Sequence, residues 1–433
     1  MNTNPTPTEL LAQVDRYLDG RLQTTRANLT IERLSLSNLV GRIVASDVHS
    51  AIALPRFRRA MMDGVAIRFQ QGLVGKHRWS VVADGNQTAS SSLPLALPIN
   101  TGGRVPDSLD AVLPRECLVA MSHSASGFEG STLIEMADSQ TIRPGQHVAR
   151  VGEDVEIGQR LMSKGRVIRS QDLGLLSACG IVHAEVFRRP RVAVALTGDE
   201  VVMPGSTLAD DQVFDANGPV LEALLRRDGA ELVSVDYLAD DSAQLQQFLC
   251  SRSADVLVLC GGTSVGPKDF SAATLRSGGV LAFHGLPLKP GRPVGLGESG
   301  LATVFLLPGN PIACQFTYDL LVGPLLRGLA GQQTDWPYSH ETVQLSEPVA
   351  SQIGRLDYLR VSGVEQTPIM DRSPIGRSRV STVGIRPALV RPLTSGRASS
   401  LTSVSEADGF VLIPIESDGL NPEDPVTCYW YDK

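Results

Sequence analysis

Three apolar runs in the second half of the chain each end directly in an unusual turn. Near-continuous apolar runs of six residues are typical of strands buried on both faces of a parallel sheet. The runs are residues 191–196 (RVAVAL) before Thr197-Gly198-Asp199-Glu200, residues 255–260 (DVLVLC) before Gly261-Gly262-Thr263, and residues 302–307 (ATVFLL) before Pro308-Gly309-Asn310-Pro311. Because ligands of open parallel sheets bind at the carboxyl ends of the strands, we predict that these turns line one crevice.

Helical segments separate these strands. Residues 218–227 (GPVLEALLRR) and 242–250 (SAQLQQFLC) have the spacing of amphipathic helices. Strand and helix in alternation predict a doubly wound parallel-sheet domain between residues 189 and 331.

The chain has 433 residues, more than one hydrophobic core usually supports, so its length predicts about three or four domains. Helices are expected at residues 8–19, closed by Gly20, and at 170–178, whereas short strand-like pieces fill 45–145 and the end of the chain. The predicted α/β multidomain architecture has a helical linker region at 1–44 plus 146–188, a β-rich domain at 45–145, the doubly wound domain at 189–331 and a C-terminal β domain at 332–433. Residues 363–384 are expected to form an irregular insertion.

Composition and motif content exclude several classes of partner and of site. The formal net charge is −7, which argues against nucleic acid. The six cysteines form no C-x-x-C pair, and no run reaches 18 apolar residues or resembles a secretory signal, so we expect a cytoplasmic protein with reduced thiols and no membrane contact. No G-x-x-x-x-G-K-[ST] or H-E-x-x-H motif occurs, which excludes a P-loop and a histidine-rich zinc site.

Carboxylates follow the predicted strands. Asp199 and Glu200 either hold Mg²⁺, whose shell substrate phosphates complete, or form a turn in which Asp199 caps backbone N–H groups. Asp215 and Asn217 precede a helix, and capping is the favoured interpretation for Asn217. Asp240 also precedes a helix, where an acidic residue favours the dipole without further function.

Two further segments favour an anionic ligand. The glycine-rich stretch 261–269 offers backbone N–H groups to an anion. Lys289 lies in Lys289-Pro290-Gly291-Arg292-Pro293, where prolines limit how far the lysine loop relaxes. Either segment alone is also compatible with an ordinary surface turn.

In this order, the motifs resemble the molybdopterin molybdenumtransferases, the molybdenum-insertion family that includes the C-terminal part of gephyrin. The resemblance covers nearly the whole chain. The matching segments are Met62-Asp63-Gly64-Val65-Ala66, Thr101-Gly102, Gly152-Glu153-Asp154, Arg189-Pro190-Arg191-Val192, Thr197 to Glu200, Gly261 to Asp269, Lys289 to Pro293 and Pro308 to Pro311.

The resemblance implies a four-domain homodimer that converts adenylylated molybdopterin and molybdate to molybdenum cofactor and AMP, assisted by Mg²⁺. It also implies apo-molybdoenzymes or other cofactor-biosynthesis proteins as partners. The implied catalytic residues are Glu200, Asp240, Asp269, Lys289 and Asp63, of which Glu200, Asp240 and Asp269 would also hold the metal. The implied pterin-binding residues are Thr101, Asp154, Gly261, Gly262, Ser264, Gly266, Pro308 and Pro311, with Asp63, Thr101 and Asp154 supplied by the partner subunit.

The chain departs from the family pattern on the oxyanion side. A lysine usual four residues before Lys289 is Gly285, and a serine usual in the Asn-Pro-Val segment is Ala313. Arg58 and Arg59 replace an acidic and an amide residue and are candidates to restore the missing charge. Arg355 and Arg360 match an arginine-bearing segment that could also contact oxyanions. Two alternatives therefore accompany the insertase: a non-catalytic carrier of molybdopterin or its cofactor, and an insertase for another oxyanion such as tungstate.

Overall fold

The computed structural model describes residues 5–28, 31–69, 77–81, 93–120, 133–137, 142–263, 270–364, 388–393, 401–422 and 424–431. The chain divides into two compact units, one made of residues 1–32 and 187–433 and the other of residues 33–186. The boundaries of the four predicted domains stay a prediction.

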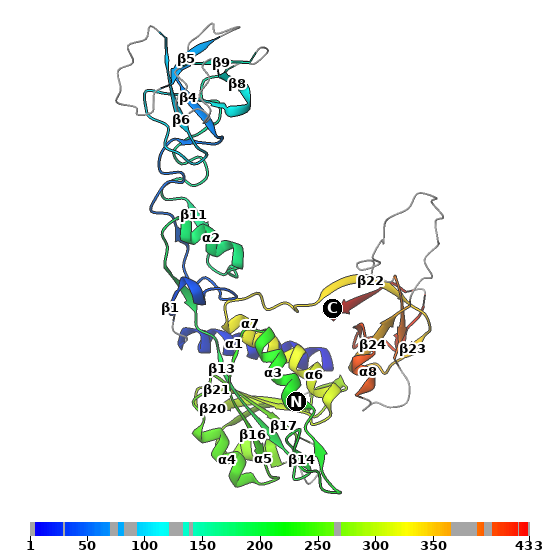
Figure 1. Cartoon of the computed structure of the whole chain (residues 1–433). Helices are drawn as coiled ribbons and strands as arrows, with labels where there is room; N and C mark the ends of the chain where they lie inside the picture. Colours follow the sequence, from blue (N-terminus) through cyan, green and yellow to red (C-terminus); the bar gives the residue numbers. More distant parts are fainter. Residues whose placement is uncertain are drawn as a thin grey trace. The chain divides into compact units, whose positions relative to one another are not determined.

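A six-stranded sheet forms the centre of the first unit (Figure 1). Its order is β16 (Glu231–Leu238), β13 (Arg191–Thr197), β17 (Val256–Cys260), β21 (Ala302–Leu307), β20 (Gly295–Ser299) and β18 (Val280–His284). The first four strands are parallel, as predicted, but β20 is antiparallel to both of its neighbours. The reason is local: only Gly300 and Leu301 separate β20 from β21, and so short a connection joins antiparallel strands only.

Helices cover both faces of this sheet, which confirms the doubly wound architecture (Figure 1). Along β13, Val192, Val194 and Leu196 enter one core, whereas Ala193 and Ala195 enter the other. This alternation follows from the two-residue period of a strand. The first core includes α3 (Asn217–Arg227), α6 (Pro311–Thr317) and α7 (Gly323–Leu329), and the second includes α4 (Ser242–Ser251) and α5 (Phe270–Gly278).

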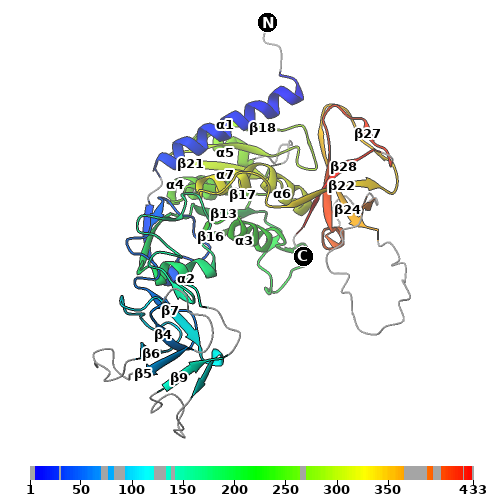
Figure 2. The ribbon, with the colours of Figure 1, turned by 90° about the horizontal axis from the view of Figure 1, so that it is seen from above.

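The N-terminal helix is longer than predicted. Helix α1 (Pro7–Asn28) continues through Gly20 and lies along α7, as the view from above shows (Figure 2). A Cβ atom at Gly328 of α7 would lie 2.8 Å from the Leu22 side chain, and the Arg21 guanidinium lies 2.6 Å from the Glu298 carboxylate. The predicted end at Gly20 was wrong because contacts beyond that residue outweigh a glycine penalty of about 1 kcal/mol.

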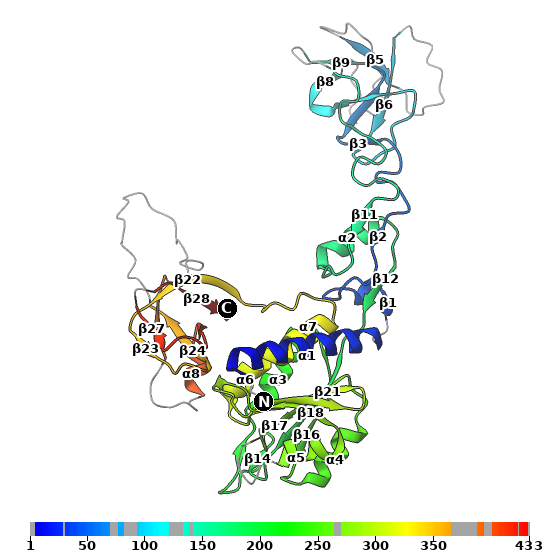
Figure 3. The same ribbon diagram turned by 180° about the vertical axis from the view of Figure 1, so that it is seen from behind.

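A second sheet of the first unit closes on itself (Figure 3). Its strands are β24 (Leu356–Gly363), β25 (Leu389–Pro392), β22 (Ser339–Leu345), β28 (Val426–Trp430) and β26 (Gly409–Ile413), and a β24–β26 pairing completes a five-stranded barrel. The short strand β19 (Leu288–Lys289) pairs in parallel with β24. The barrel confirms the β structure expected in this part of the chain. Most of the insertion expected at 363–384 lies outside the described residues.

The second unit is built mainly of β structure, as expected for residues 45–145. Short strands also occur in the flanking segments, where the sequence predicted a helical linker region. The largest sheet of the unit has the order β7 (Ala111–Pro114), β4 (Gly64–Ile67), β6 (Leu95–Ile99), β5 (Arg78–Val81), β9 (Leu133–Met136) and β8 (Leu118–Ala120). Helix α2 spans Ser170–Ala178, the range predicted for it. Two-stranded pairs complete the unit: β1 (Ile31–Ser35) with β12 (His183–Phe187), β2 (Val48–His49) with β11 (Arg160–Met162), and β3 (Arg59–Ala60) with β10 (Val148–Ala149).

The first unit also contains several short strands and one short helix. The remaining elements are β14 (Val201–Val202), β15 (Val213–Phe214), β23 (Val349–Ala350), β27 (Gly419–Leu420) and α8 (Thr402–Ser405), with single turns at Leu36–Asn38, Arg115–Cys117 and Tyr318–Val322. All six cysteines are free thiols; Cys250 is exposed, Cys117 is partly buried and the others are buried. No helix among the described residues is long and apolar enough to cross a membrane.

Candidate functional site

The carboxyl ends of four adjacent parallel strands meet at one edge of the first sheet, which we call the carboxyl edge. It is defined by Asp199 and Glu200 after β13, Asp240 after β16, Gly261 and Gly262 after β17, and Pro308 to Pro311 after β21. Hydrogen bonds join neighbouring turns: Gly198 N donates to Leu238 O over 3.3 Å, and Gly261 N donates to Leu307 O over 3.1 Å. The edge therefore brings together the turns that the sequence predicted to share a site.

Glycine is required where these turns approach one another. At Gly261, φ is +102° and a Cβ atom would lie 2.4 Å from the Thr197 carbonyl oxygen. A Cβ at Gly262 would lie 2.7 Å from Ser271 Oγ. At Gly309, by contrast, a Cβ would make only an ordinary contact with the Gly261 Cα atom, at 3.5 Å. Close backbone approach without side chains is the property of loops that present N–H groups to anions. The predicted residues Ser264, Gly266 and Asp269 lie outside the described residues.

The start of α3 corrects the prediction for Asp215 and Asn217. Asp215, not Asn217, caps this helix: its carboxylate accepts hydrogen bonds from the backbone N–H groups of Asn217 and Gly218 over 2.8 and 2.9 Å. The Asn217 side chain instead donates to Gly309 O over 2.8 Å and so ties α3 to the Pro308 turn. Asp215 is the better cap because it lies two residues before Asn217, outside the helix, whereas Asn217 is already the first helical residue.

Asp215 also accepts a hydrogen bond from the Tyr237 hydroxyl over 3.0 Å. Burial and this carboxylate raise the pKa of Tyr237 to about 12. The carboxylate of Asp215 is thus engaged in structure beneath the carboxyl edge.

Three exposed carboxylates lie at the carboxyl edge: Asp199, Glu200 and Asp240. Asp199 Oδ1 accepts the Asp240 N–H over 3.1 Å, which confirms a capping role for Asp199. Asp241, rather than Asp240, caps α4 by accepting the Ala243 N–H over 2.9 Å. The Glu200 carboxylate folds back over Gly198, where a Cβ atom would lie 3.0 Å from Glu200 Oε2.

Oxygen donors of this kind suit Mg²⁺, which takes one or two protein carboxylates and completes its shell with water and substrate phosphate. Glu200 and Asp240 fit that requirement. Within the described ranges no three metal-binding side chains gather at one point, and the third predicted ligand, Asp269, is outside those ranges.

Lys289 is tied to the barrel. Its Nζ atom lies 3.5 Å from Asp357 Oδ2, and the Arg355 Nε atom lies 2.8 Å from Asp357 Oδ1. Asp357 is buried, whereas the Lys289 side chain is 57% exposed. One buried carboxylate therefore orients two cations, with a net positive charge left over. Arg360, on the opposite face of β24, contacts Ser403 instead.

Sequence reasoning missed Asp357. The pattern that could have indicated it is Arg355-Leu356-Asp357, because alternate residues of a strand share a face and this places an arginine beside a carboxylate. The contact with Lys289 depends on the β19–β24 pairing, for which the sequence carries no local signal.

The structure shows the backbone at Gly285 and Ala313, the two positions that differ from the family pattern on the oxyanion side. Gly285 adopts φ of +82°, a conformation that costs a lysine about 1–2 kcal/mol. The absent lysine thus accompanies a backbone that disfavours it. Ala313 is buried in the first turn of α6, where its N–H donates to the Asn310 side chain over 3.2 Å.

The second unit joins two of its predicted site residues. Asp63 Oδ1 accepts the backbone N–H and the hydroxyl of Thr101, over 2.6 and 2.8 Å. These hydrogen bonds, with a smaller contribution from Arg115, lower the pKa of Asp63 below its ordinary value. Asp154 is exposed, and its backbone N–H donates to Leu54 O, away from this pair.

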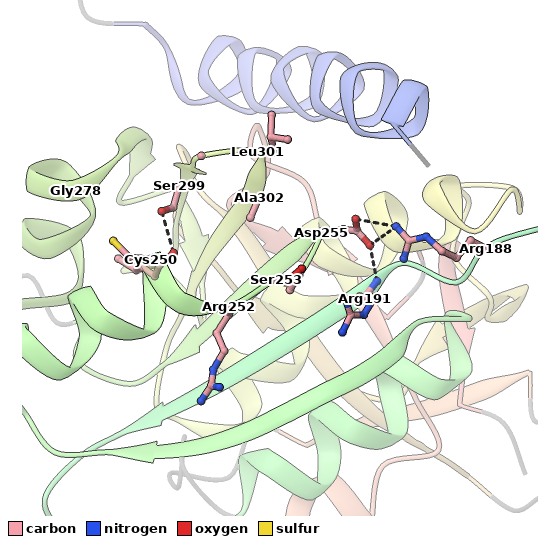
Figure 4. Close-up of a pocket in the computed structure, with 13 residues that line it drawn as sticks. Arg188, Arg191, Cys250, Arg252, Ser253, Asp255, Gly278, Ser299, Leu301 and Ala302 are labelled. Carbon is pink, nitrogen blue, oxygen red and sulfur yellow. Dashed lines mark hydrogen bonds and ion pairs between the residues drawn. The ribbon is translucent and has the colours of Figure 1, made fainter. Parts of the chain in front are cut away.

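A pocket of about 760 Å³ lies at the opposite, amino-terminal end of the first sheet (Figure 4). Its charged groups are paired: Arg188 with Asp255 inside the pocket, and Arg191 and Arg252 with carboxylates that do not line it. Asp255 accepts hydrogen bonds from the Arg188 guanidinium over 3.0 Å and from the Arg191 N–H over 2.7 Å, and Arg252 pairs with Asp236. These contacts hold the strand starts together, so the pocket is not the predicted ligand site.

The fold and the carboxyl edge define a class: a doubly wound α/β protein whose strand ends present glycine backbone and carboxylates. Lys289 lies apart from this edge, on a strand that pairs with the barrel. Comparison with known proteins identifies the family. Residues 12–180 match the model described as "MoeA N-terminal region (domain I and II)", and residues 193–328 match "Probable molybdopterin binding domain". The chain therefore belongs to the MoeA family of molybdopterin biosynthesis proteins.

Named relatives agree with this assignment. The chain is 31% identical to the molybdopterin molybdenumtransferase of Haemophilus influenzae, over 76% of this chain and 80% of the relative. It is 30% identical to molybdopterin molybdenumtransferase 2 of Mycobacterium tuberculosis, over 75% of this chain and 81% of the relative. A crystal structure of a molybdopterin biosynthesis MoeA protein from Pyrococcus horikoshii superposes with a TM-score of 0.74 at 28% identity, covering 96% of this chain and 99% of that one.

Proposed function

We propose that the protein inserts molybdenum into adenylylated molybdopterin, giving molybdenum cofactor and AMP. The observation that carries the proposal is the carboxyl edge, where the turn with Glu200 lies between the turn with Asp240 and the glycine turn. All three turns belong to the region that matches the molybdopterin-binding model. Relatives at about 30% identity are named molybdopterin molybdenumtransferases, which supports the same reaction here.

Each group at this edge has a role in the proposed reaction. An oxygen atom of molybdate or of water attacks phosphorus, the phosphoanhydride bond that links AMP to the pterin phosphate breaks, and the departing phosphate takes the negative charge. At the glycine turn, Gly261 would let a pterin phosphate approach the backbone and the Gly262 N–H would donate to it, with Pro308 and Pro311 shaping the wall. Glu200 and Asp240 would hold Mg²⁺, which supplies charge neutralisation at the phosphates when bound.

Lys289 would contact an anionic oxygen of molybdate, since Asp357 orients it while more than half of its side chain stays exposed. Asp63, Thr101 and Asp154 would complete the site from the partner subunit of a homodimer. The protein's further partners in this proposal are apo-molybdoenzymes or other cofactor-biosynthesis proteins.

A second candidate is a carrier that binds molybdopterin or its cofactor without inserting metal. The observation that favours it is Gly285, whose positive φ disfavours the lysine that the family pattern has there. A third is an insertase for tungstate, favoured by the same change of charge around the oxyanion.

Release of AMP tests the proposal. Purified protein is mixed with adenylylated molybdopterin and Mg²⁺, and AMP is measured while molybdate is titrated from zero. Molybdate-dependent release is expected. Tight pterin binding without release would overturn insertion in favour of the carrier, and preferential release with tungstate in a competition would favour the third candidate.

A further inference from the structure

Two arginines of the second unit face each other across a backbone pairing. Val105 N donates to Arg58 O over 2.8 Å, and Ala60 N donates to Gly103 O over 2.9 Å. Arg59 and Arg104 form the antiparallel bridge between these two hydrogen bonds. This is the non-hydrogen-bonded type of pair, in which opposite side chains are closest, with Cβ atoms about 4.5–5.5 Å apart. Both side chains are exposed on the same face.

Like charges directly opposite on paired strands destabilise a fold. Among the ion pairs formed by the described part of the chain, no carboxylate neutralises Arg59 or Arg104. The Arg104 guanidinium lies over the ring of Phe57, 6.0 Å from its centroid, and that ring is 38% exposed. The two guanidinium groups therefore repel each other, and a bound anion would remove this repulsion.

Arg58 does not belong to this pair. Strand alternation turns it to the other face, where it is half-buried and its Nη1 atom lies 3.5 Å from Pro106 O. Arg58 and Arg59, the two candidates to restore the missing charge, therefore point to opposite faces of one segment.

We propose that Arg59 and Arg104 bind one tetrahedral oxyanion of the phosphate class, either as a free anion or as the phosphoryl group of a nucleotide. Guanidinium groups bind such oxyanions through paired N–H donors, and two of them on one face match a doubly charged ligand. Phe57, two residues before Arg59 on the same face, offers an aromatic surface for a purine base. The inference concerns binding to the second unit and does not rest on the proposed insertion reaction.

Binding of inorganic phosphate to the full chain, measured by equilibrium dialysis with radiolabelled phosphate, tests the proposal. Arg59→Ala and Arg104→Ala are each expected to weaken binding about tenfold, the effect of losing one charge-assisted contact. Arg160→Ala is the matched control, because Arg160 is an exposed arginine of the same unit that pairs with Asp47 over 3.2 Å. No saturable phosphate binding by the natural protein, or unchanged binding in both variants, would overturn the proposal.

Parallel titrations with AMP distinguish the two sources of the phosphoryl group. If the ligand is a nucleotide, AMP binds more tightly than phosphate and Phe57→Ala weakens AMP binding more than phosphate binding. If the ligand is a free anion, Phe57→Ala changes both affinities by the same factor, and AMP binds no more tightly than phosphate. Both outcomes support an oxyanion site at the arginine pair.

Thermal unfolding gives a second test. If the arginine pair binds an anion, the difference in Tm between the variant and the natural protein changes sign when phosphate is added, which a merely structural role would not produce. Without phosphate, Arg59→Ala is expected to raise the Tm of the second unit, because it removes the repulsion. With saturating phosphate the order reverses, because only the natural pair gains from the ligand. A variant less stable than the natural protein in both conditions by the same amount would contradict the proposal.

Discussion

The Lys289 Nζ atom lies 3.5 Å from Asp357 Oδ2, which joins a loop of the doubly wound domain to a strand of the barrel. Asp357 is buried and also accepts hydrogen bonds from Arg355 and from the Ser351 hydroxyl. A buried carboxylate with several donors has little freedom to move. The position of Lys289 at the proposed oxyanion site therefore depends on the barrel.

Asp357→Asn is expected to raise the KM for molybdate about tenfold with a smaller change in kcat, since the Lys289 ammonium loses its partner. Steady-state AMP release at varied molybdate measures this split. Asp418→Asn, an exposed carboxylate of the same part of the chain, is the control. An unchanged KM in a folded Asp357→Asn protein would show that Lys289 is positioned by other contacts.

Gly285→Lys introduces the lysine of the family pattern, but we expect it to destabilise the protein. Because φ at Gly285 is +82°, the substitution should lower the free energy of unfolding by about 1–2 kcal/mol. Gly285→Ala separates the backbone cost from any benefit of the lysine charge, because no atom lies within 4 Å of a Cβ there. Denaturant unfolding of both variants provides the measurement, and a stability equal to the natural protein would refute the backbone explanation.

Gly261→Ala should abolish pterin binding and lower the free energy of unfolding by about 1–3 kcal/mol. The added Cβ would lie 2.4 Å from Thr197 O, so the turn must move. Gly309→Ala is the matched control, because its Cβ would make only an ordinary contact at 3.5 Å with Gly261 Cα. Fluorescence titration with molybdopterin and urea unfolding compare the two. Equal behaviour of both variants would contradict the geometry of the carboxyl edge.

The Asp63 carboxyl should titrate below the ordinary range because Thr101 donates two hydrogen bonds to it. A lowered folded pKa means that this contribution to stability is present above the unfolded pKa of about 3.9 and is lost as pH falls through the folded pKa. Thr101→Val removes the hydroxyl and is expected to raise the pKa of Asp63.

Carbon-detected NMR titration of the carboxyl groups measures this shift. Asp47 serves as an internal control, because its pKa is lowered by Lys164 and Arg160 instead. A pKa of Asp63 that stays the same in Thr101→Val would assign its lowering to the backbone N–H alone.

The elements near the carboxyl edge were predictable because their signals are local. Apolar runs mark β13, β17 and β21, and the turn residues follow each run directly. Gly198 and Gly261 mark positions where the backbone needs unusual φ values. These features need no knowledge of distant parts of the chain.

The remaining features depend on contacts between distant residues. Helix α1 passes Gly20 because Arg21 and Leu22 find partners far along the chain. The Asn217 side chain bonds Gly309, 92 residues away, and the approach of Asp357 to Lys289 depends on strand pairing. A sequence read in isolation carries no signal for these outcomes.

Single-turnover AMP release by the natural protein and by Glu200→Gln, with Mg²⁺ and molybdate present, tests the central claim most directly. If the carboxyl edge carries out insertion, the natural protein releases AMP only with molybdate. Glu200→Gln then releases it about a hundredfold more slowly while still binding the pterin. The account is contradicted if the natural protein releases no AMP, or if both proteins release it at the same rate.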